Sequence, residues 1–576
     1  MEKNLKIADI LNEIGDMLEI QGELPFKVNA YRKASRIISE LTEDIQILQD
    51  ENKLAKLPGI GKAMLSKIDE FLKTGKISKH VQLREEVPQD LLNLLNIQNL
   101  GPKTIGLLYK KLNIRNLEDL QKAIDSGELT KLPGMGEKKI ENIRQGIDHF
   151  QSSTGRVAID AAWNLIDRII LELKQRIQCE KISAAGSARR MRETVGDIDI
   201  LAAAGNGKEV IETFVNLPFV NRVLAAGDTK GSVIVEDKIQ IDLRVVAPES
   251  YGAARQYFTG SQAHNVKLRG IARKRGLKIT EYGIFRDEVK LGGAEESEIY
   301  EHLNLPWIAP ELREDRGEIE AAAENKLPNL IRQEDILGDL HVHSLYSDGH
   351  ASIAEMAAAA QKLGYHYLAI CDHSQTAFYA NGLTPDRILK QIEEIRKLNE
   401  KMSDFTILSG TEVDILPDGK LDFPDEILKE LDIVVASIHS AFKQQPTERL
   451  INAMENPYVN IIGHPTGRLI SRREGYDVDL ARVIEVAAKT NTALEINSYP
   501  DRLDLSDMNA RRAIDAGVLL SINTDAHSPR DFSYIKYGIA TARRGWLQKE
   551  NVLNTMSIKI IREWQAKKSA KNDSFK

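Results

Sequence analysis

The chain has 576 residues, of which 42% are hydrophobic and 28% charged, and its formal net charge is -7. A chain of this length folds as several domains, and this composition excludes a disordered or wholly basic protein. Any nucleic-acid binding must therefore be local. The two cysteines, Cys179 and Cys371, are too few for a disulfide framework or a thiolate zinc site, which indicates a reducing compartment.

The N-terminus and the hydropathy pattern bear on location. The first residues, MEKNLKIADILNEIGDML, carry acids among their apolar positions and lack the apolar core of a signal peptide. No run of 18 apolar residues follows in the sequence. We therefore predict a cytoplasmic protein with no membrane partner.

Residues 1–150 are predicted to be helical throughout, because apolar residues recur at i, i+3 and i+4 in segments such as IADILNEIGDML. Two segments, LPGIGKAMLSKI (57–68) and LPGMGEKKIENI (132–143), are near repeats. Each is a Pro-Gly-x-Gly turn that opens an amphipathic helix, and IQNLGPKTIGLLY (97–109) is a looser third copy. The repetition predicts a shared role for the turns.

Glycines in these turns let the backbone approach another molecule, and the following helix N-terminus offers free N–H groups. Residues 1–150 contain 23 Lys or Arg and 23 Asp or Glu, so a broad basic surface is not the binding mechanism. We predict that backbone amides around Gly59, Gly61, Gly134 and Gly136 contact DNA phosphates. The alternative is a helix-turn-helix that serves only packing.

The first hairpin also carries a family resemblance. FKVNAYRKASRII, followed by LPGIGKAMLSKIDEFLKTG, resembles the N-terminal domain of the family X DNA polymerases, the group of eukaryotic DNA polymerase β. In that family a lysine on the next helix forms a Schiff base with a 5′-deoxyribose phosphate, and Lys67 matches it. Lys27, Lys62 and Arg32 could supply nearby positive charge. The resemblance implies either lyase chemistry or a 5′-phosphate contact for Lys67.

Acidic residues dominate the next section, which mixes helical and β-like runs and is predicted to be an α+β domain. Asp197 and Asp199, in VGDIDILA, alternate on a predicted strand and so share one face. Asp242 lies in a second apolar strand run, IQIDLRVVA. Three carboxylates that converge on a sheet can bind Mg²⁺ for nucleotidyl transfer. The alternative for Asp197 and Asp199 is a solvated edge strand.

A Gly-Ser turn precedes the acidic pair. Gly186 and Ser187 lie about ten residues upstream of the Asp-x-Asp pattern, and this spacing resembles the nucleotidyltransferase signature. The resemblance implies that backbone N–H and hydroxyl groups there donate to nucleotide phosphates and that Arg190 adds charge. We place Gly196 in the same nucleotide-binding group.

A local basic segment follows. Residues 255–278 contain seven Lys or Arg and no acid. YFTGSQAHNVKLRGIARKRGLKITEYG (257–283) resembles the family X element that closes over the incoming nucleotide and the template. The alternative reading, a solvated basic helix, fits the charges but not the Tyr-Phe-Thr-Gly-Ser turn.

That resemblance implies particular contacts. Tyr257 and Phe258 lie beside the sugar, and Gly260 permits close backbone approach. Asn265 reaches the base edge and Arg269 the template side. The family usually has a bulky residue or an acid where Gln262 and His264 stand, so their roles stay open.

Metal-ligand residue types gather in the last third of the chain. The apolar run LGDLHVHS ends in two histidines, an aspartate follows in the loop, and five later strand-like runs carry a histidine, a carboxylate or both near their ends. The candidate ligands are His341, His343, Asp348, His373, Glu412, His439, His464, Asp525 and His527. Six of the chain's 12 histidines are in this set, which argues against chance. Only TALEINS ends without an obvious ligand.

Seven strand-like runs, each followed by a helical pattern, predict a barrel of βα units whose loops gather at one end. Nitrogen and oxygen ligands without thiolate suit two or three ions of Mn²⁺, Zn²⁺ or Fe²⁺, and Glu412 is the natural bridge between two of them. The set resembles the PHP (polymerase and histidinol phosphatase) family, which hydrolyses phosphate esters at a multinuclear metal site on a distorted seven-stranded barrel. Arg468 is a candidate phosphate contact.

We therefore predict an all-α helix-hairpin-helix N-terminal region, an α+β nucleotidyltransferase palm of polymerase β type, and a C-terminal distorted (β/α)7 PHP barrel. The predicted ranges are 1–95 for a DNA and 5′-phosphate-binding domain, 96–150 for a second helix-hairpin-helix, 151–250 for the palm, 251–315 for the closing subdomain, 316–336 for a linker and 337–570 for the PHP domain.

The combination resembles the bacterial family X DNA polymerases, which join a polymerase β-like core to a PHP domain. The resemblance implies template-directed filling of short gaps in base excision repair, with Mg²⁺ at the palm. It further implies Mn²⁺-dependent 3′-5′ exonuclease activity and abasic-site endonuclease activity at the PHP domain, whose site would hold two or three ions of Mn²⁺ or Zn²⁺. Gapped or 5′-phosphorylated DNA and dNTPs are the expected partners of a monomer. The alternatives are a gap-binding scaffold, or a polymerase whose PHP domain is a small-molecule phosphatase.

Overall fold

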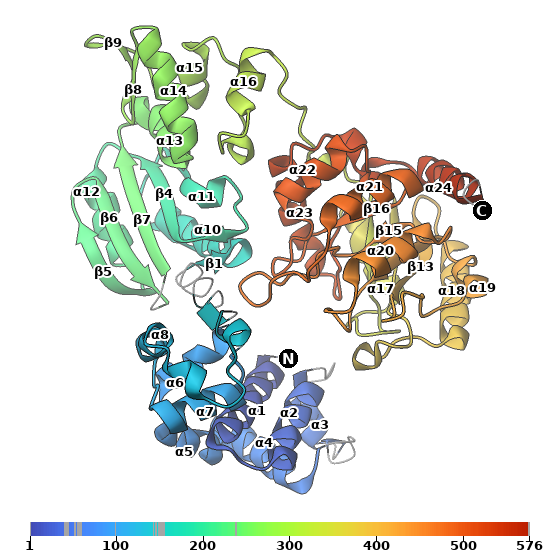
Figure 1. Ribbon diagram of the computed structural model, residues 1–576. Coiled ribbons are helices and arrows are strands. Elements are labelled where there is room, and N and C mark those ends of the chain that lie inside the picture. Colours follow the sequence, from blue (N-terminus) through green and yellow to red (C-terminus); the bar gives the residue numbers. More distant parts are fainter. Residues whose placement is uncertain are drawn as a thin grey trace. The chain divides into compact units, whose positions relative to one another are not determined.

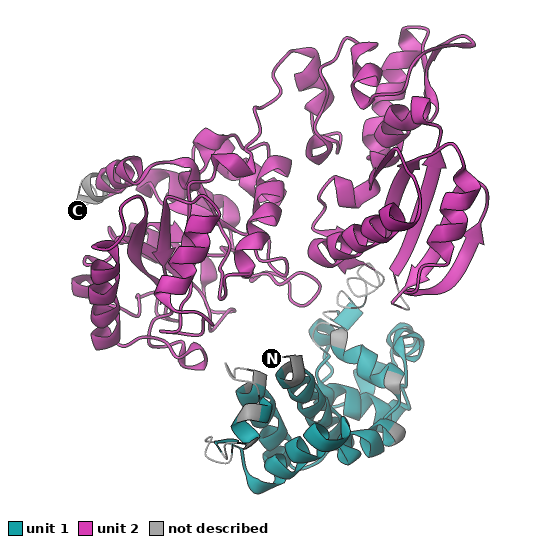
Figure 2. Ribbon diagram, turned by 180° about the vertical axis from the view of Figure 1, so that it is seen from behind, with its two compact units in different colours: residues 1–154 teal, residues 155–576 magenta. Residues whose placement is uncertain are grey.

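The computed structural model describes residues 2–39, 45–50, 53–54, 60–97, 100–141, 143–144, 147, 156–236 and 239–573. The chain divides into two compact units, residues 1–154 and 155–576 (Figure 2). None of the described helices is both long and apolar enough to cross a membrane.

The first unit is helical, as the sequence predicts (Figure 1). Helix α1 buries Ile7, Leu11, Ile14 and Leu18, one face of a helix, in the core of this unit. The described helices are α1 (Glu2–Gln21), α2 (Pro25–Ser39), α3 (Ile45–Asp50), α4 (Lys62–Thr74), α5 (Ser78–Glu86), α6 (Gln89–Asn93), α7 (Pro102–Leu112) and α8 (Leu117–Asp125).

The second unit begins with a five-stranded sheet in the order β2-β4-β7-β6-β5. β4 and β7 are parallel and the other pairs are antiparallel. Helices α10 and α12 share a hydrophobic core with this sheet. The elements are β1 (Val157–Ala158), α10 (Ile159–Arg176), β2 (Lys181–Ala184), α11 (Gly186–Arg189), β3 (Thr194–Val195), β4 (Asp197–Ala203), α12 (Gly207–Val215), β5 (Val220–Ala226), β6 (Lys230–Val235) and β7 (Ile239–Val246).

A smaller α+β part follows, with an antiparallel sheet in the order β10-β9-β8. Its elements are α13 (Tyr251–Thr259), α14 (Gln262–Lys274), β8 (Lys278–Thr280), β9 (Gly283–Arg286), β10 (Val289–Gly292), α15 (Glu296–Glu301) and α16 (Glu318–Ala323). α16 lies in the range predicted as a linker, yet its Ile319 and Ala322 belong to the same core as Leu268 of α14.

The rest of the unit is a barrel of seven parallel strands in sequence order (Figure 1). The strands are β11 (Gly338–Val342), β12 (Tyr367–Ile370), β13 (Thr406–Asp414), β14 (Ile433–Ser437), β15 (Ile461–Ile462), β16 (Ala493–Asn497) and β17 (Leu520–Asn523). Val342 bridges to Ala526 just after β17, so the first and last strands nearly close the barrel. The predicted seven-stranded fold is confirmed.

Helices cover the outside of the barrel. Along β12, Leu368 and Ile370 pack in the core under the helices, whereas Tyr367 and Ala369 pack in a second core that the strands share. The helices are α17 (Ile353–Lys362), α18 (Pro385–Asn399), α19 (Asp425–Leu428), α20 (Pro446–Glu455), α21 (Leu480–Thr490), α22 (Asp507–Asp515), α23 (Ile535–Arg544) and α24 (Ile558–Asp573).

Ion pairs link the barrel to the α+β parts within the second unit. Arg468 donates to Glu193 at 2.7 Å, and Arg544 donates to Glu314 at 3.0 Å. Leu503 and Tyr537 of the barrel pack in the hydrophobic core of the five-stranded sheet. Arg468, the candidate phosphate contact, is therefore occupied by an acid 275 residues away in sequence.

Lys568 of α24 is fully buried, and its Nζ donates to the Met454 carbonyl at 3.0 Å. Burial lowers the pKa of Lys568 to about 7. Between pH 7 and 10 the unfolded chain holds a proton here that the folded chain does not, so this group makes stability rise with pH, by up to about 1.4 kcal/mol per pH unit. Lys568→Met should lose that rise.

Urea unfolding at pH 7 and pH 9.5 checks this expectation. The exposed neighbour Lys567 supplies the control, because Lys567→Met should follow the wild-type pH dependence. Equal pH dependence in Lys568→Met and the wild type would show that Lys568 stays charged in the fold.

Candidate functional site

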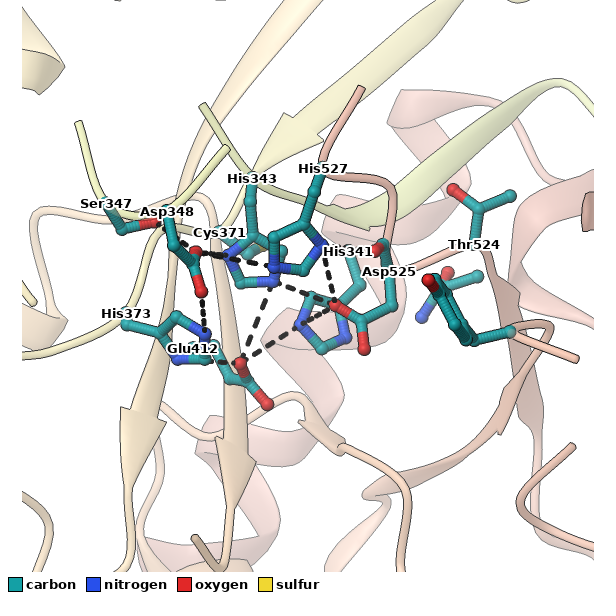
Figure 3. Close-up of polar contacts among 12 residues, drawn as sticks. His341, His343, Ser347, Asp348, Cys371, His373, Glu412, Thr524, Asp525 and His527 are labelled. Carbon is teal, nitrogen blue, oxygen red and sulfur yellow. Dashed lines mark hydrogen bonds and ion pairs between the residues drawn. The ribbon is translucent and has the colours of Figure 1, made fainter. Parts of the chain in front are cut away.

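Nine predicted ligands converge at the carboxyl ends of the barrel strands. Figure 3 labels all of them except His439 and His464. We call the nine residues the rim cluster. Each belongs to a strand end or to the loop that follows it: His341 and His343 at β11, Asp348 in the next loop, His373 after β12, Glu412 in β13, His439 after β14, His464 after β15, and Asp525 and His527 after β17. Parallel strands bring these ends to one edge of the barrel, which is why residues nearly 190 positions apart meet.

Glu412 lies at the centre of the rim cluster. It is 1% exposed, and its two oxygens face different histidines. Oε2 lies 3.0 Å from His373 Nδ1 and 3.5 Å from His341 Nε2. Oε1 lies 3.0 Å from His464 Nε2 and 3.2 Å from His439 Nε2. This placement suits a carboxylate shared between two cations.

The two aspartates complete the rim cluster on its other side. Asp525 Oδ1 lies 3.0 Å from His343 Nε2, and Asp348 Oδ1 lies 3.3 Å from His527 Nε2. The His343 and His527 rings stack with centroids 4.3 Å apart. Asp348 Oδ2 lies 3.6 Å from His373 Nε2. All nine side chains are thus connected.

Several buried ring nitrogens fit a metal better than they fit the protein. His341 Nε2, His343 Nδ1 and Nε2, His373 Nδ1 and His464 Nδ1 make no hydrogen bond of acceptable geometry among the described residues, although carboxylate oxygens lie 3.0 Å from His343 Nε2 and His373 Nδ1. An unsatisfied buried polar atom costs about 1–3 kcal/mol. Divalent cations take such nitrogens as ligands, and three subsets of the cluster have ligand atoms within 4.8 Å of one another.

Two carboxylates that the sequence reasoning missed orient these histidines. Glu495 Oε1 accepts a hydrogen bond from His341 Nδ1 at 2.8 Å, and its Oε2 accepts one from the His464 backbone N–H at 2.8 Å. Asp414 hydrogen-bonds His439 Nδ1. Such partners fix the ring and leave the other nitrogen for the metal. The signal was an acid within a fully buried strand: Glu495 in ALEIN, the run without an obvious ligand.

The carboxylates also set the protonation of the cluster. Burial lowers the pKa of His439, but the charges of Glu412 and Asp414 outweigh it and raise that pKa to about 10. Burial raises the pKa of Glu412, but the surrounding histidines hold it well below its usual range. Without a metal His439 is therefore a cation, and metal binding must release its proton.

A second acidic site lies on the five-stranded sheet. The register places Asp199 of β4 opposite Asp242 of β7, and Asp197 opposite Gln240. Ile198 and Ile200 are buried, so the two β4 aspartates share the other face as predicted. Burial, together with the negative charges of Asp197 and Asp242, raises the pKa of Asp199 to about 7. A divalent cation would relieve that repulsion.

Asp242 has a cationic partner in the sheet. Lys230 Nζ lies 2.9 Å from Asp242 Oδ2, and Gln240 donates to Asp242 Oδ1 at 3.0 Å. Burial raises the pKa of Asp242, but these hydrogen bonds and one from Ser232 lower it overall. We call Asp197, Asp199 and Asp242 the acidic triad. It therefore contains a firmly charged carboxylate, Asp242, beside one that titrates near neutrality, Asp199.

The Gly-Ser turn is packed against the triad. Gly186 has φ +59°, and a Cβ there would lie 2.1 Å from Asp199 Oδ2. Ser187 follows in α11, a helix of four residues. Gly196 directly precedes Asp197, and a Cβ there would lie 3.2 Å from Arg156 Nη1. Gly186 therefore lies so close to the Asp199 carboxylate that no side chain fits at this position.

Arg190 and part of the closing segment bond to protein groups. Arg190 Nε donates to Glu314 at 3.1 Å. Asn265 is 8% exposed and donates to the Tyr257 carbonyl at 2.7 Å. Arg269 lies 5.8 Å from the centre of the Tyr257 ring. A contact of Asn265 with the nucleotide requires its bond to Tyr257 to open, whereas Arg269 is exposed.

The structure also shows the contacts of the remaining residues of the closing segment. The Tyr257 and Phe258 rings meet edge to face, with centroids 5.2 Å apart. Gly260 has φ +68°, and a Cβ there would lie 3.1 Å from Arg190 Nη1. Gln262 begins α14. The open role of His264 is answered: it is buried between Glu318, at 2.7 Å, and Tyr300, at 3.1 Å, and so holds α16 in place.

The glycine turns of the first unit face open space. A Cβ added at Gly61, Gly134 or Gly136 would meet no atom of the described residues within 4 Å, and Gly134 has φ +76°. Gly61 is the N-cap of α4. Packing contacts do not explain why these positions are glycine. This favours the prediction that the turns bind another molecule over the alternative that they serve only packing. Gly59 lies outside the described residues.

Lys67 lies on α4, 5.7 Å from the centre of the Tyr31 ring. Its Nζ donates to the Ala63 carbonyl at 3.5 Å. Arg32, one of the cations expected to assist it, pairs with Asp16 at 2.8 Å and with a second acid. That pairing weakens the local positive charge.

Comparison with known families fits this architecture. Residues 2–77 match a helix-hairpin-helix domain and residues 91–148 a SAM-like helix-hairpin-helix tandem. Residues 254–314 match the DNA polymerase beta thumb, and residues 339–499 match the PHP domain. The chain is thus a polymerase β-type protein joined to a PHP domain, and its PHP domain implies a divalent-metal site.

Relatives narrow this class to one family. The chain is 43% identical over 564 residues to the DNA polymerase/3′-5′ exonuclease PolX of Bacillus subtilis (strain 168), covering 96% of this chain and 98% of that protein. The chain belongs to this family of bacterial family X polymerases. Its PHP part is also 32% identical over 248 residues to a probable phosphatase of Thermoanaerobacter sp. (strain X514), covering 40% of this chain and 96% of that protein. A probable phosphatase of Clostridium acetobutylicum is 30% identical over 251 residues, covering 41% and 96%.

Proposed function

We propose that this chain adds nucleotides to DNA primers at the palm and removes nucleotides from DNA 3′ ends at the PHP barrel. One observation carries the proposal. The acidic triad and the nine-residue rim cluster occur together in a chain that is 43% identical, over 96% of its length, to a DNA polymerase/3′-5′ exonuclease.

At the palm, Asp197, Asp199 and Asp242 would hold Mg²⁺, which stabilises the charge that develops in phosphoryl transfer. The close packing of Gly186 on Asp199 fixes the position of that carboxylate. Ser187 and Arg190 are proposed to bind the nucleotide phosphates, together with Gly196. Glu314 competes for Arg190, so phosphate binding must replace that ion pair.

At the barrel, the rim cluster would hold two or three ions of Mn²⁺ or Zn²⁺, which activate water and neutralise phosphate charge. Glu495 and Asp414 orient His341 and His439 for that purpose. Arg502 lies 3.9 Å from Asp525, so it borders the cluster and replaces Arg468 as the proposed phosphate contact.

The proposal extends to the biological substrate. We propose gapped, 5′-phosphorylated DNA as the polymerase substrate, held through the glycine turns, and gap filling in base excision repair as the role. Lys67 would bind the 5′-phosphate or act as the lyase nucleophile. Tyr257, Phe258, Gly260, Asn265 and Arg269 are proposed to contact nucleotide and template. Abasic-site endonuclease activity, a monomer and a cytoplasmic location complete the proposal.

One specific observation favours a second candidate for the barrel. The relatives that match only this part are named probable phosphatases. A small-molecule phosphatase would release phosphate from monoesters and leave DNA intact. A gap-binding scaffold is disfavoured, because binding alone would not need both the acidic triad and the buried rim cluster.

The test uses a gapped, 5′-phosphorylated duplex with dNTPs and Mn²⁺. Asp197→Ala/Asp199→Ala should abolish extension only, and His341→Ala/His343→Ala should abolish degradation only. Intact primer degradation in the histidine variant would overturn the nuclease assignment. Release of phosphate from monoesters, without nucleotides from DNA, would favour the phosphatase.

A further inference from the structure

The loop after β12 carries two exposed aromatic side chains. Its short 3-10 turn, η7 (Phe378–Ala380), begins five residues after His373. Phe378 is 84% exposed, the most of any large hydrophobic side chain in the described part of the chain, and Tyr379 is 51% exposed. Burying a phenylalanine is worth about 1.5–3 kcal/mol, which this side chain forgoes in the isolated protein.

Looseness of the loop does not explain this exposure. Ala377 and Ala380, on either side of the aromatic pair, are buried, and the Ala380 N–H donates to the Ala377 carbonyl at 2.9 Å. The Leu383 N–H donates to the His373 carbonyl at 2.7 Å and closes the loop. Arg387 donates to two carbonyls of the loop. A braced loop therefore presents the two rings to solvent.

Tyr379 borders the rim cluster, and Phe378 precedes it in the turn. The Tyr379 ring centroid lies 6.2 Å from that of His373 and 6.5 Å from that of His439. A strand end that reaches the cluster with its phosphodiester therefore has these rings beside its bases.

A protein partner fits this feature poorly. A specific protein interface needs about 800 Å² from each side, whereas an aromatic side chain supplies at most about 150–250 Å². A nucleobase fits it well, because stacking on one ring is worth about 1–3 kcal/mol and accepts any base. The rim cluster would engage only phosphate, so the base needs a contact of another kind.

We propose that Phe378 and Tyr379 form a stacking platform for the unpaired bases at the 3′ end of the DNA strand being degraded. This inference rests on the proposed nuclease function and assigns two residues that contact its substrate. A base can stack on the platform only after it leaves its own duplex.

The primary test compares two single-stranded oligonucleotides that differ only at the 3′ end, one normal and one with two terminal abasic residues. The readout is the ratio of their kcat/KM values with Mn²⁺. Both substrates are degraded at the same cluster, so a general loss of activity lowers both kcat/KM values equally and leaves their ratio unchanged. The wild-type protein should prefer the normal end about tenfold, equivalent to about 1.4 kcal/mol.

Phe378→Ala should bring the ratio close to one, and Phe378→Trp should restore it. Leu363 is a matched control: it is 55% exposed and lies just before β12, at the opposite end of the barrel, so Leu363→Ala should keep the wild-type ratio. A wild-type ratio that persists in Phe378→Ala would overturn the platform. So would a change in oligomeric state in that variant without a change in the ratio, which would indicate a protein partner.

A second readout does not need catalysis. An oligonucleotide with 3′-terminal 2-aminopurine, mixed with the full chain in Ca²⁺, should lose fluorescence by stacking, and Phe378→Ala should retain fluorescence. Quenching without any DNA degradation would support the platform while refuting the proposed nuclease. Degradation with no Phe378-dependent quenching would refute the platform alone.

Discussion

Replacing Glu412 with glutamine should reduce degradation of DNA 3′ ends on the order of 10³-fold and leave primer extension at the wild-type rate. The amide keeps the shape of the carboxylate but removes its charge. Two histidines face each oxygen of Glu412, at 3.0 and 3.5 Å on one side and at 3.0 and 3.2 Å on the other. A neutral group there cannot be shared between two divalent cations.

Three further measurements test the interpretation of the Glu412→Gln result. Glu495→Gln, which changes the hydrogen-bond partner of His341 and His464 but removes no predicted ligand, should cost about 10–100-fold in degradation. Glu393→Gln should cost nothing, because Glu393 is exposed and pairs only with Lys397, at 2.7 Å. Metal analysis of the purified Glu412→Gln protein should find fewer bound ions than in the wild type. If Glu412→Gln degraded DNA at the wild-type rate, the barrel would not be the nuclease site.

The rim cluster could be predicted because its residues mark strand ends. Parallel strands bring their carboxyl ends to one edge, so a histidine after one strand and an aspartate after another meet without any knowledge of packing. The same reasoning missed Glu495 and Asp414. Glu495 lies inside β16 and Asp414 is the last residue of β13, and the partner of each depends on which neighbouring segment faces it. His341 and Glu495 are 154 positions apart, and no local pattern joins them.

Partners of charged side chains were the least predictable feature. Arg468 follows His464 closely, which suggested a phosphate contact, but it pairs with Glu193 from the other end of the second unit. His264 looked like a departure from a nucleotide-binding motif, but it bonds to Glu318 of α16. In both cases the partner comes from a distant segment. The residue types could be read from the sequence, but their bonding partners could not.

Gly186→Ala should reduce primer extension by about 10²-fold or more, through displacement of Asp199. The added Cβ would lie 2.1 Å from Asp199 Oδ2, and φ +59° is itself unfavourable for alanine. Either the turn or the carboxylate must move. A shift of about 1 Å in a group that positions reacting atoms costs about this much. The readout is the rate of nucleotide addition on a gapped duplex, with degradation at the barrel measured in parallel.

Gly205, in the loop that follows β4, offers the matched control. A Cβ there would meet no described atom within 4 Å, so Gly205→Ala should extend primers normally. Extension that falls equally in both variants would show that any alanine weakens the sheet. Normal extension by Gly186→Ala would contradict the predicted displacement of Asp199 and show that the turn can absorb the added Cβ. Loss confined to Gly186→Ala, with degradation intact, would tie the turn to the triad alone, because general unfolding of the second unit would also disturb the barrel.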